Sequence, residues 1–108
     1  MVIDLAQVVC KVRHEVLAAH GVEPGTRIPA EVFCEIPQVL MSMDGAMRGT
    51  MDGALEERGL KRRVAMTVPH FQAVALCVAE SGMLGNLPVH FGRAAAELLG
   101  LELYLPPF

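Results

Sequence analysis

The chain has 108 residues, of which 53% are apolar and 19% are charged, and its formal net charge is −3. This length and composition are typical of one compact domain with a buried core, and they exclude a disordered segment. The basic cluster Lys61, Arg62 and Arg63 is short, and an acidic chain has no general attraction for phosphate backbones. We therefore expect this segment to make no direct contact with nucleic acid.

We also expect no membrane segment and no cofactor. No apolar run approaches the roughly 18 to 20 residues of a membrane span, and the first residues lack the order of a signal peptide. The expected compartment is the cytoplasm. Cys10, Cys34 and Cys77 are widely spaced and form no metal-ligand pattern, so reduced, buried thiols and no metal site are expected.

The first part of the chain predicts a strand, a helix and a second strand. Residues 7–13 are rich in β-branched side chains and predict a strand, which a turn-rich stretch over 21–27 follows. A short helix is expected over 28–36, with Pro29 in its first turn. After it, residues 38–43 look extended.

A helix with signals at both ends comes next. Thr50 can cap a helix over 51–58, and Gly59 stands where such a helix would end. Residues 62–68 then predict another strand, an extended apolar run that stops at Pro69.

Two further helices are indicated by apolar residues at helical spacing. The second of them opens at Pro88 and closes at Gly100, and the strands 83–87 and 101–105 flank it. We expect the apolar positions to face the core. They are Phe71, Val74, Ala75 and Val78 in the first helix, and Phe91, Ala95 and Leu98 in the second.

The alternation of strands and short helices predicts the architecture. Residues 1–108 are expected to form a single α/β domain with a mostly parallel five-stranded sheet. Helices should cover both faces of the sheet, which makes three layers. The last strand, 101–105, would leave an open sheet edge that is a candidate surface for self-association.

The stretch VAMTVPHF at residues 64–71 indicates a corner between a strand and a helix. Val68 precedes a proline and is therefore biased towards extended geometry, whereas Pro69 fits the first turn of a helix. In an open α/β sheet such corners lie at the carboxyl ends of strands, where ligands bind. His70 and Phe71 would stand at that edge.

Three such corners, MSMDGAMRG, TVPHF and GNLPVHF, occur in the chain. If their strands are parallel, the corners line one rim and a small polar ligand could meet them together. Structural roles are also open: a His at a helix start is often a capping or solvated residue, Phe71 can be a core residue, and Asn86 a turn former. The candidate ligand residues of the rim are Ser42, Met43, Thr67, His70, Phe71 and Asn86.

Residues 60–108 resemble a known family. Their sequence, with RRVAMTVPHF and GNLPVHFG as its most specific segments, is similar to the effector-binding domain of LysR-type transcriptional regulators. The resemblance is to the branch that contains nodulation regulators and regulators of aromatic degradation, and VVCKVRHEVLA and IPQVLMSMDG extend it upstream. Gln38 departs from the family, because relatives often carry His there.

The resemblance implies a fold and a function. It implies the second of two subdomains of a periplasmic-binding-protein type II fold, with the DNA-binding head and the first subdomain outside this chain. An inducer, an aromatic acid or flavonoid-like compound, would bind between the subdomains of a homo-oligomeric regulator. The resemblance carries over Ser42, Met43, Asp44, His70 and Phe71. Together with Gln38 and with Thr67 and Asn86 of the rim, the expected effector-binding residues are Gln38, Ser42, Met43, Asp44, Thr67, His70, Phe71 and Asn86.

Two other functions remain open at this level. An enzyme could use His70 as base and Cys77 as nucleophile, but seven residues on one helix separate them by roughly 10 Å. A free-standing interaction domain that associates with itself is the other alternative. The residues favour a sensing module without catalytic residues.

Overall fold

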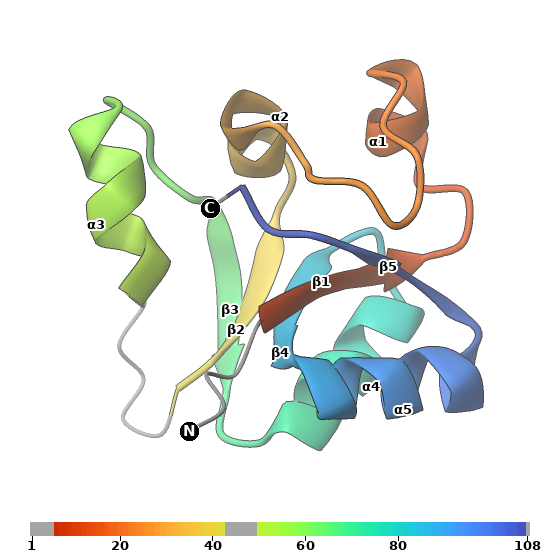
Figure 1. Ribbon diagram of the computed structural model, residues 1–108. Helices are drawn as coiled ribbons and strands as arrows, with labels where there is room; N and C mark the ends of the chain where they lie inside the picture. Colours follow the sequence, from red (N-terminus) through yellow and green to blue (C-terminus); the bar gives the residue numbers. More distant parts are fainter. Residues whose placement is uncertain (1–5, 43–49, 108) are drawn as a thin grey trace.

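The computed structural model describes residues 6–42 and 50–107 of the chain (Figure 1). Strands and helices alternate there largely as the sequence predicts, with one additional helix near the start. The elements in chain order are β1 (Ala6–Lys11), α1 (Glu15–Ala19), α2 (Ala30–Glu35), β2 (Gln38–Met41), α3 (Thr50–Glu57), β3 (Val64–Val68), α4 (Phe71–Ala79), β4 (Leu84–Pro88), α5 (Val89–Leu99) and β5 (Leu101–Tyr104).

The strands form one five-stranded sheet in the order β3-β2-β4-β1-β5. β2 is parallel to both β3 and β4, whereas β1 is antiparallel to both β4 and β5. The sheet is therefore mixed, with β1 running against the other strands. The five-stranded α/β fold is confirmed, and its parallel part consists of β3, β2 and β4.

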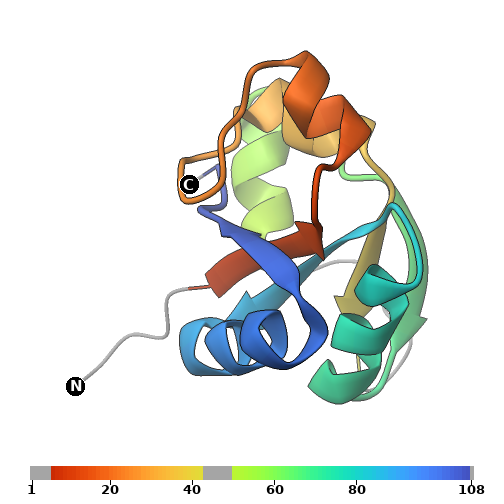
Figure 2. The same ribbon diagram turned by 90° about the vertical axis from the view of Figure 1, so that its right-hand side faces the viewer.

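Helices cover both faces of the sheet, so the predicted three layers are present. α1, α2 and α3 lie on one face, and α4 and α5 lie on the other (Figure 2). Each face has its own core. The core under the first three helices contains Leu17 of α1, Phe33 of α2 and Leu55 of α3. The core on the opposite face contains Val74 of α4 and Ala95 of α5.

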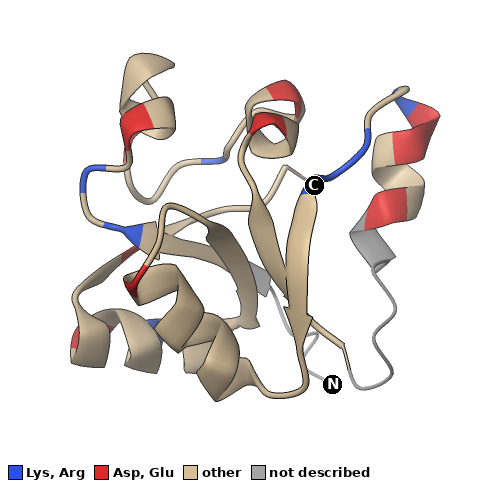
Figure 3. Ribbon diagram, turned by 180° about the vertical axis from the view of Figure 1, so that it is seen from behind, with Lys and Arg blue, Asp and Glu red and all other residues tan. Residues whose placement is uncertain are grey.

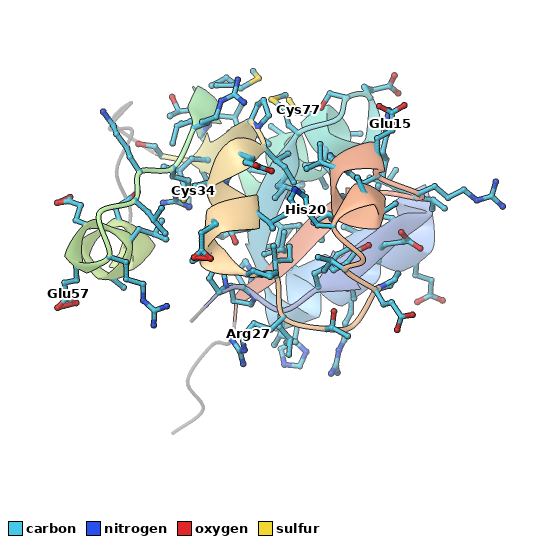
Figure 4. All side chains as sticks on the ribbon, turned by 90° about the horizontal axis from the view of Figure 1, so that it is seen from above. Glu15, His20, Arg27, Cys34, Glu57 and Cys77 are labelled. Atoms are coloured by element: carbon cyan, nitrogen blue, oxygen red, sulfur yellow. The ribbon has the colours of Figure 1, made fainter. Side chains whose placement is uncertain are left out.

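α1 is a helix that the sequence pattern did not indicate, because its five residues are too few to show a helical repeat. Tertiary contacts hold it in place. Leu17 is fully buried, and His14 Nε2 lies 2.6 Å from the carbonyl oxygen of Gly82 before β4. At its other end, His20 Nε2 lies 3.0 Å from Glu35 Oε2, which connects α1 to α2 (Figure 4).

β3 begins at Val64, two residues later than predicted. Arg62 lies before the strand and binds a side chain of α3 instead of a neighbouring strand. The Arg62 side chain is buried and donates two hydrogen bonds to Asp52, of 2.6 Å from Nη2 to Oδ2 and 3.3 Å from Nε to Oδ1. Asp52 lies in the first turn of α3. The ion pair therefore attaches α3 to the segment that leads into β3.

Gly85 in β4 sets the distance between the sheet and α4. A Cβ atom at this position would lie 2.6 Å from Val74 Cγ1 and 2.8 Å from Val78 Cγ2, which is closer than carbon atoms approach without displacement. Both valines are fully buried in α4. The lack of a side chain at Gly85 thus allows α4 to pack directly on the central part of the sheet.

Two predictions about the surface were wrong. Leu98 has helical spacing with the core residues of α5, yet 82% of its surface is exposed. The outer edge of β5 is not open either, because Gly25, Ile28 and Leu105 form backbone hydrogen bonds there with Leu103, Leu105 and Thr26. The loop before α2 covers that edge, and the open edge of the sheet among the described strands is β3.

The cysteines are free thiols, as expected, but only Cys10 is fully buried. Cys34 and Cys77 are partly exposed and lie on α2 and α4, which cover opposite faces of the sheet (Figure 4). No helix within residues 6–42 and 50–107 has the length and apolar character that crossing a membrane requires.

Candidate functional site

The carboxyl ends of β2, β3 and β4 meet at one edge of the sheet, because these three strands are neighbours and parallel. The backbone N–H of Ser42 donates a 2.9 Å hydrogen bond to the carbonyl oxygen of Val68, which joins the ends of β2 and β3. The described residues of the three predicted corners therefore line one edge, and those of the first corner are Met41 and Ser42. We refer to the carboxyl ends of β2, β3 and β4 as the strand-end rim.

The rim contains a topological switch point between β2 and β4. The chain leaves β2 through α3 towards β3 on one side, whereas it leaves β4 through α5 towards β5 on the other. β2 and β4 pair only at their beginnings, through Gln38 with Leu84 and Val39 with Gly85. No pairing of β2 with β4 follows these residues in the described strands, and ligands of open α/β sheets bind at such a point.

Three polar side chains at the rim share one face of the sheet. Met41, Val68 and Leu87 belong to the core under α4 and α5. Because side chains alternate along a strand, their neighbours Ser42, Thr67 and Asn86 point to the opposite face, which α1, α2 and α3 cover. Ser42 and Asn86 thus flank the switch point from its two sides.

Asn86 is the unusual member of this group. Its Nδ2 and Oδ1 atoms are both shielded from solvent and have no hydrogen-bond partner among the described residues. An unpaired buried amide or carbonyl group costs about 1–3 kcal/mol. Such a group in a native protein calls for an explanation, and a ligand that supplies the missing partners is one.

His70 and Phe71 lie at the rim but differ in surroundings. His70 is the N-cap residue of α4, and its exposed side chain makes no capping hydrogen bond. Phe71 begins α4 and packs against Phe91 at a centroid distance of 5.6 Å, in the core between α4, α5 and the sheet. Phe71 is therefore a core residue, whereas the exposed side chain of His70 is accessible to a ligand.

Three further candidate residues are not brought to the described rim. Gln38 starts β2, at the amino end of the strand, and its Nε2 donates a 2.8 Å hydrogen bond to the carbonyl oxygen of Phe33. Its side chain is fully buried, and the structure gives it no place at the strand ends. Met43 and Asp44 lie outside the described residues.

The described part of the rim carries no Lys, Arg, Asp or Glu side chain. Ser42, Thr67 and Asn86 are neutral, and Figure 3 shows β2 and β3 without Lys, Arg, Asp or Glu along their length. Recognition by these residues would therefore rely on hydroxyl, amide and backbone groups. Such groups bind a ligand by hydrogen bonds whose geometry is specific.

The described residues form neither a metal-ligand cluster nor the His70–Cys77 pair. No group of three or more His, Cys, Asp or Glu side chains within 6–42 and 50–107 could hold a metal ion. His70 precedes α4 and Cys77 lies at the end of its second turn, so their side chains do not meet. Burial raises the pKa of the Cys34 thiol, which lowers its reactivity as a nucleophile.

A pocket among the described residues lies at the opposite edge of the sheet. It has a volume of about 380 Å³ and is lined by Lys11, His14, Glu15 and the residues around Pro37 and Gly82. The Nδ1 atom of His14 is shielded from solvent and has no hydrogen-bond partner among the described residues. The pocket lies beside the amino ends of β2 and β4, whereas open α/β sheets bind ligands at the carboxyl ends of their strands.

A mixed α/β fold with polar groups at a topological switch point is typical of ligand-binding α/β domains. The comparison with known families agrees: residues 5–108 match the model of the LysR substrate binding domain, so the chain belongs to the LysR substrate-binding domain family. Its fold is accordingly periplasmic-binding-protein-like.

Similar proteins are transcriptional regulators. The chain is 29% identical over 91 residues to the HTH-type transcriptional activator NahR of Pseudomonas putida, and 30% identical over 80 residues to NagR of Ralstonia sp. These matches cover 82% and 72% of the chain. They span only 30% of NahR and 27% of NagR.

Solved structures show the same architecture. The probable transcriptional regulator PA0477 from Pseudomonas aeruginosa superposes with a TM-score of 0.79 at 30% identity, over 97% of this chain and 33% of that one. The regulatory domain of the transcriptional activator MexT from the same organism has a TM-score of 0.74 at 23% identity, over 97% of this chain and 46% of that one. The chain thus corresponds to part of a larger regulator in each case.

Proposed function

We propose that this chain is the second subdomain of a LysR-type effector-binding domain, and that its strand-end rim forms one wall of an effector cleft. The other wall would come from a first subdomain, and a helix-turn-helix head would contact DNA. The chain itself has a net charge of −3 and no role in DNA contact in this proposal. It acts as a sensor in the cytoplasm, not as an enzyme.

The observation that carries the proposal is the buried, unpaired amide of Asn86 beside the switch point. A side-chain amide has two N–H donors and one oxygen acceptor, so it can form hydrogen bonds with a carboxylate or a hydroxyl group of a ligand. Ser42 and Thr67, on the same face of the neighbouring strands, would supply hydroxyl groups, and His70 a ring nitrogen. We assign these four residues to the effector.

The chemistry of the rim fits a small, neutral-to-anionic aromatic compound. A phenol or a carboxylate can bond to hydroxyl and amide groups without a paired cation, and backbone N–H groups at the start of α4 favour an anion. The half-buried Leu40, between Gln38 and Ser42 on β2, would offer an apolar contact. An aromatic acid or a flavonoid-like compound is therefore the proposed ligand class.

Coupling to DNA binding would follow from the two-subdomain geometry. A ligand shifts an equilibrium only if it binds one arrangement of the subdomains better than the other. This chain alone should bind the effector weakly, since it supplies only one wall of the cleft and therefore only part of the contacts with the ligand. In the whole regulator, closure of the cleft would then change how the subunits of an oligomer present their DNA-binding heads.

The direct test is NMR titration of the isotope-labelled 108-residue chain with benzoate, a hydroxybenzoate and a flavone. We expect weak, saturable shifts in the millimolar range, localised to the backbone amides of Ser42, Thr67, His70 and Asn86. Shifts confined to residues around His14, or no shifts with any of the probes, would refute the assignment of the rim.

A substitution at Asn86 gives a sharper test. Asn86→Leu removes an unpaired buried amide at similar volume, so we expect the free energy of unfolding to rise by about 1 kcal/mol while the ligand-induced shifts disappear. Urea denaturation and the same titration measure the two effects. Gln38→Leu is the matched control, because it replaces a buried amide away from the rim and should preserve the ligand response. If the Asn86→Leu chain still responds like the wild type, the amide has no part in recognition.

A further inference from the structure

The pocket beside the amino ends of β2 and β4 is large enough for a small molecule. Its volume is about 380 Å³, and pockets that bind small molecules measure roughly 300–1,000 Å³. A 2.9 Å hydrogen bond from the N–H of Leu84 to the carbonyl oxygen of Pro37 joins the starts of the two strands. The end of β1 and the start of α1 complete the lining. The strand-end rim lies at the other ends of β2 and β4, so the two places are separate.

His14 lines this pocket and is a buried side chain with an unpaired atom. Only 5% of its surface is exposed, and its Nε2 atom lies 2.6 Å from the carbonyl oxygen of Gly82. Because a carbonyl oxygen only accepts hydrogen bonds, Nε2 carries a proton, and in the neutral ring Nδ1 is then an acceptor. No described residue donates to Nδ1. A ligand with an N–H or O–H group would supply the missing donor.

Two residues of opposite charge also line the pocket. Lys11 is the last residue of β1 and Glu15 is the first residue of α1, and both are exposed (Figure 4). Neither forms an ion pair with another described residue. Between them, Arg13 has a φ of +59°, a left-handed conformation that is unfavourable for a residue with a Cβ atom. The turn at Arg13 thus leaves a cation and an anion unpaired beside one pocket.

The remaining side chains of the lining are apolar. Ile36 is buried, and Val16, Pro37 and Met83 are partly exposed. An apolar group of a ligand would leave water on contact with them, which favours binding. The pocket therefore offers partners for an anion, a cation with N–H donors and an apolar group. An α-amino acid with an apolar side chain carries these three groups on neighbouring atoms.

We propose that this pocket binds a free α-amino acid with an apolar side chain, such as leucine. The carboxylate of the ligand pairs with Lys11, and its ammonium group donates hydrogen bonds to Glu15 and to Nδ1 of His14. The apolar side chain contacts Ile36 and Met83. Both charged partners are exposed, so each ion pair contributes little and a dissociation constant in the millimolar range is expected. The proposal does not depend on the effector function, because none of these residues belongs to the strand-end rim.

NMR titration of the isotope-labelled 108-residue chain with three probes tests the proposal. The probes are leucine, isocaproate, which lacks the ammonium group, and isoamylamine, which lacks the carboxylate. We expect leucine to shift the backbone amides of Glu15, Val16 and Met83 and to bind about threefold to fivefold more tightly than either analogue. The ring Nδ1 resonance of His14 should also move, because this atom gains a donor. The exposed ring of His20 on the same helix is the internal control.

Substitutions of the two charged residues assign each to one group of the ligand. Lys11→Gln should weaken leucine binding about threefold and leave isoamylamine binding unchanged, whereas Glu15→Gln should weaken leucine and leave isocaproate unchanged. Arg93→Gln and Glu97→Gln are the matched controls, because they remove the same charges from exposed positions of α5 on the other face of the sheet. All four residues are exposed, so the fold should persist, which circular dichroism verifies.

Three outcomes would overturn the amino-acid site. They are leucine-induced shifts that are absent or confined to the strand-end rim, equal affinity for leucine and both analogues, and control variants that weaken leucine binding as much as the pocket variants do. None of these outcomes bears on the binding of aromatic acids at the rim, which the titration with benzoate tests separately.

Discussion

At the scale of single residues, burial decides the chemistry of Cys10. This side chain lies on β1, fully buried, directly opposite Glu102 of β5. Burial, and to a lesser extent the charge of Glu102, raises the pKa of the Cys10 thiol from 9.0 to about 12. Burial likewise raises the pKa of the nearby Tyr104 from 10.0 to about 12. Both groups are therefore kept neutral by the fold.

These shifts predict how stability depends on alkaline pH. Above pH 9.0 the unfolded chain loses the Cys10 proton, whereas the folded chain holds it until about pH 12. The unfolded state then binds fewer protons, so the free energy of unfolding falls as pH rises through this window. We expect the melting temperature to be steady below pH 9.0 and to decline above it.

Cys10→Val is the variant that tests the assignment. Valine is apolar and of similar size, so the cost at neutral pH should stay below about 1.5 kcal/mol, and part of the alkaline decline should vanish. Tyr104→Phe should remove another part. Melting curves with the same alkaline slope in all three chains would contradict the role given to these groups.

The other informative residues concern the candidate site. The local sequence predicted that Ser42, Thr67, His70 and Asn86 lie near strand ends, and the structure brings them to one edge. The sequence could not show that both polar atoms of Asn86 are shielded and unpaired, since that depends on segments far away in the chain. Gln38 was drawn into the predicted site by family resemblance alone, and lies at the other end of its strand.

At the scale of secondary-structure elements, the packing of α4 on β4 depends on Gly85. Gly85→Ala would force its new methyl group against Val74 and Val78, at 2.6 and 2.8 Å in the present geometry. We expect a loss of about 1–3 kcal/mol in the free energy of unfolding, measured by urea denaturation. Adding Val74→Ala should recover part of this loss, because it makes room for the methyl group.

Gly53 in α3 provides the matched control. A Cβ atom there meets nothing within 4 Å, so Gly53→Ala adds helix propensity without a clash. This change should raise the free energy of unfolding by about 0.5–1 kcal/mol. If both alanine substitutions had the same effect, steric contact at Gly85 could not be the cause of the first.

The elements themselves were largely predictable because their signals are local. Gly59 and Gly100 end α3 and α5 with φ values of +71° and +68°, which glycine adopts without strain. α1 was missed, because five residues carry no helical repeat and its place is set by Leu17 and His14. Helical spacing also suggested a core position for Leu98, which lies on the side of α5 that nothing in the described chain covers.

At the scale of the whole molecule, the strand order predicts an uneven distribution of stability. β4 and β1 lie inside the sheet and pair on both sides, and both cores contact them. β3 pairs on one side only. We expect the amides of β1 and β4 to exchange with deuterium slowest and those of β3 fastest among the strands. Native-state exchange followed by NMR measures this, and a β3 strand as protected as β1 would contradict it.

The sequence by itself determined the α/β class, the ends of most elements, the free cysteines and the corners that belong to strand ends. Each of these follows from neighbouring residues, through periodicity, capping residues or proline geometry. The tertiary structure alone decided that β1 runs against its neighbours, that the loop before α2 covers β5, and that Asn86 is buried without a partner. Those features depend on pairing between residues distant in the chain, whose energies local patterns do not contain.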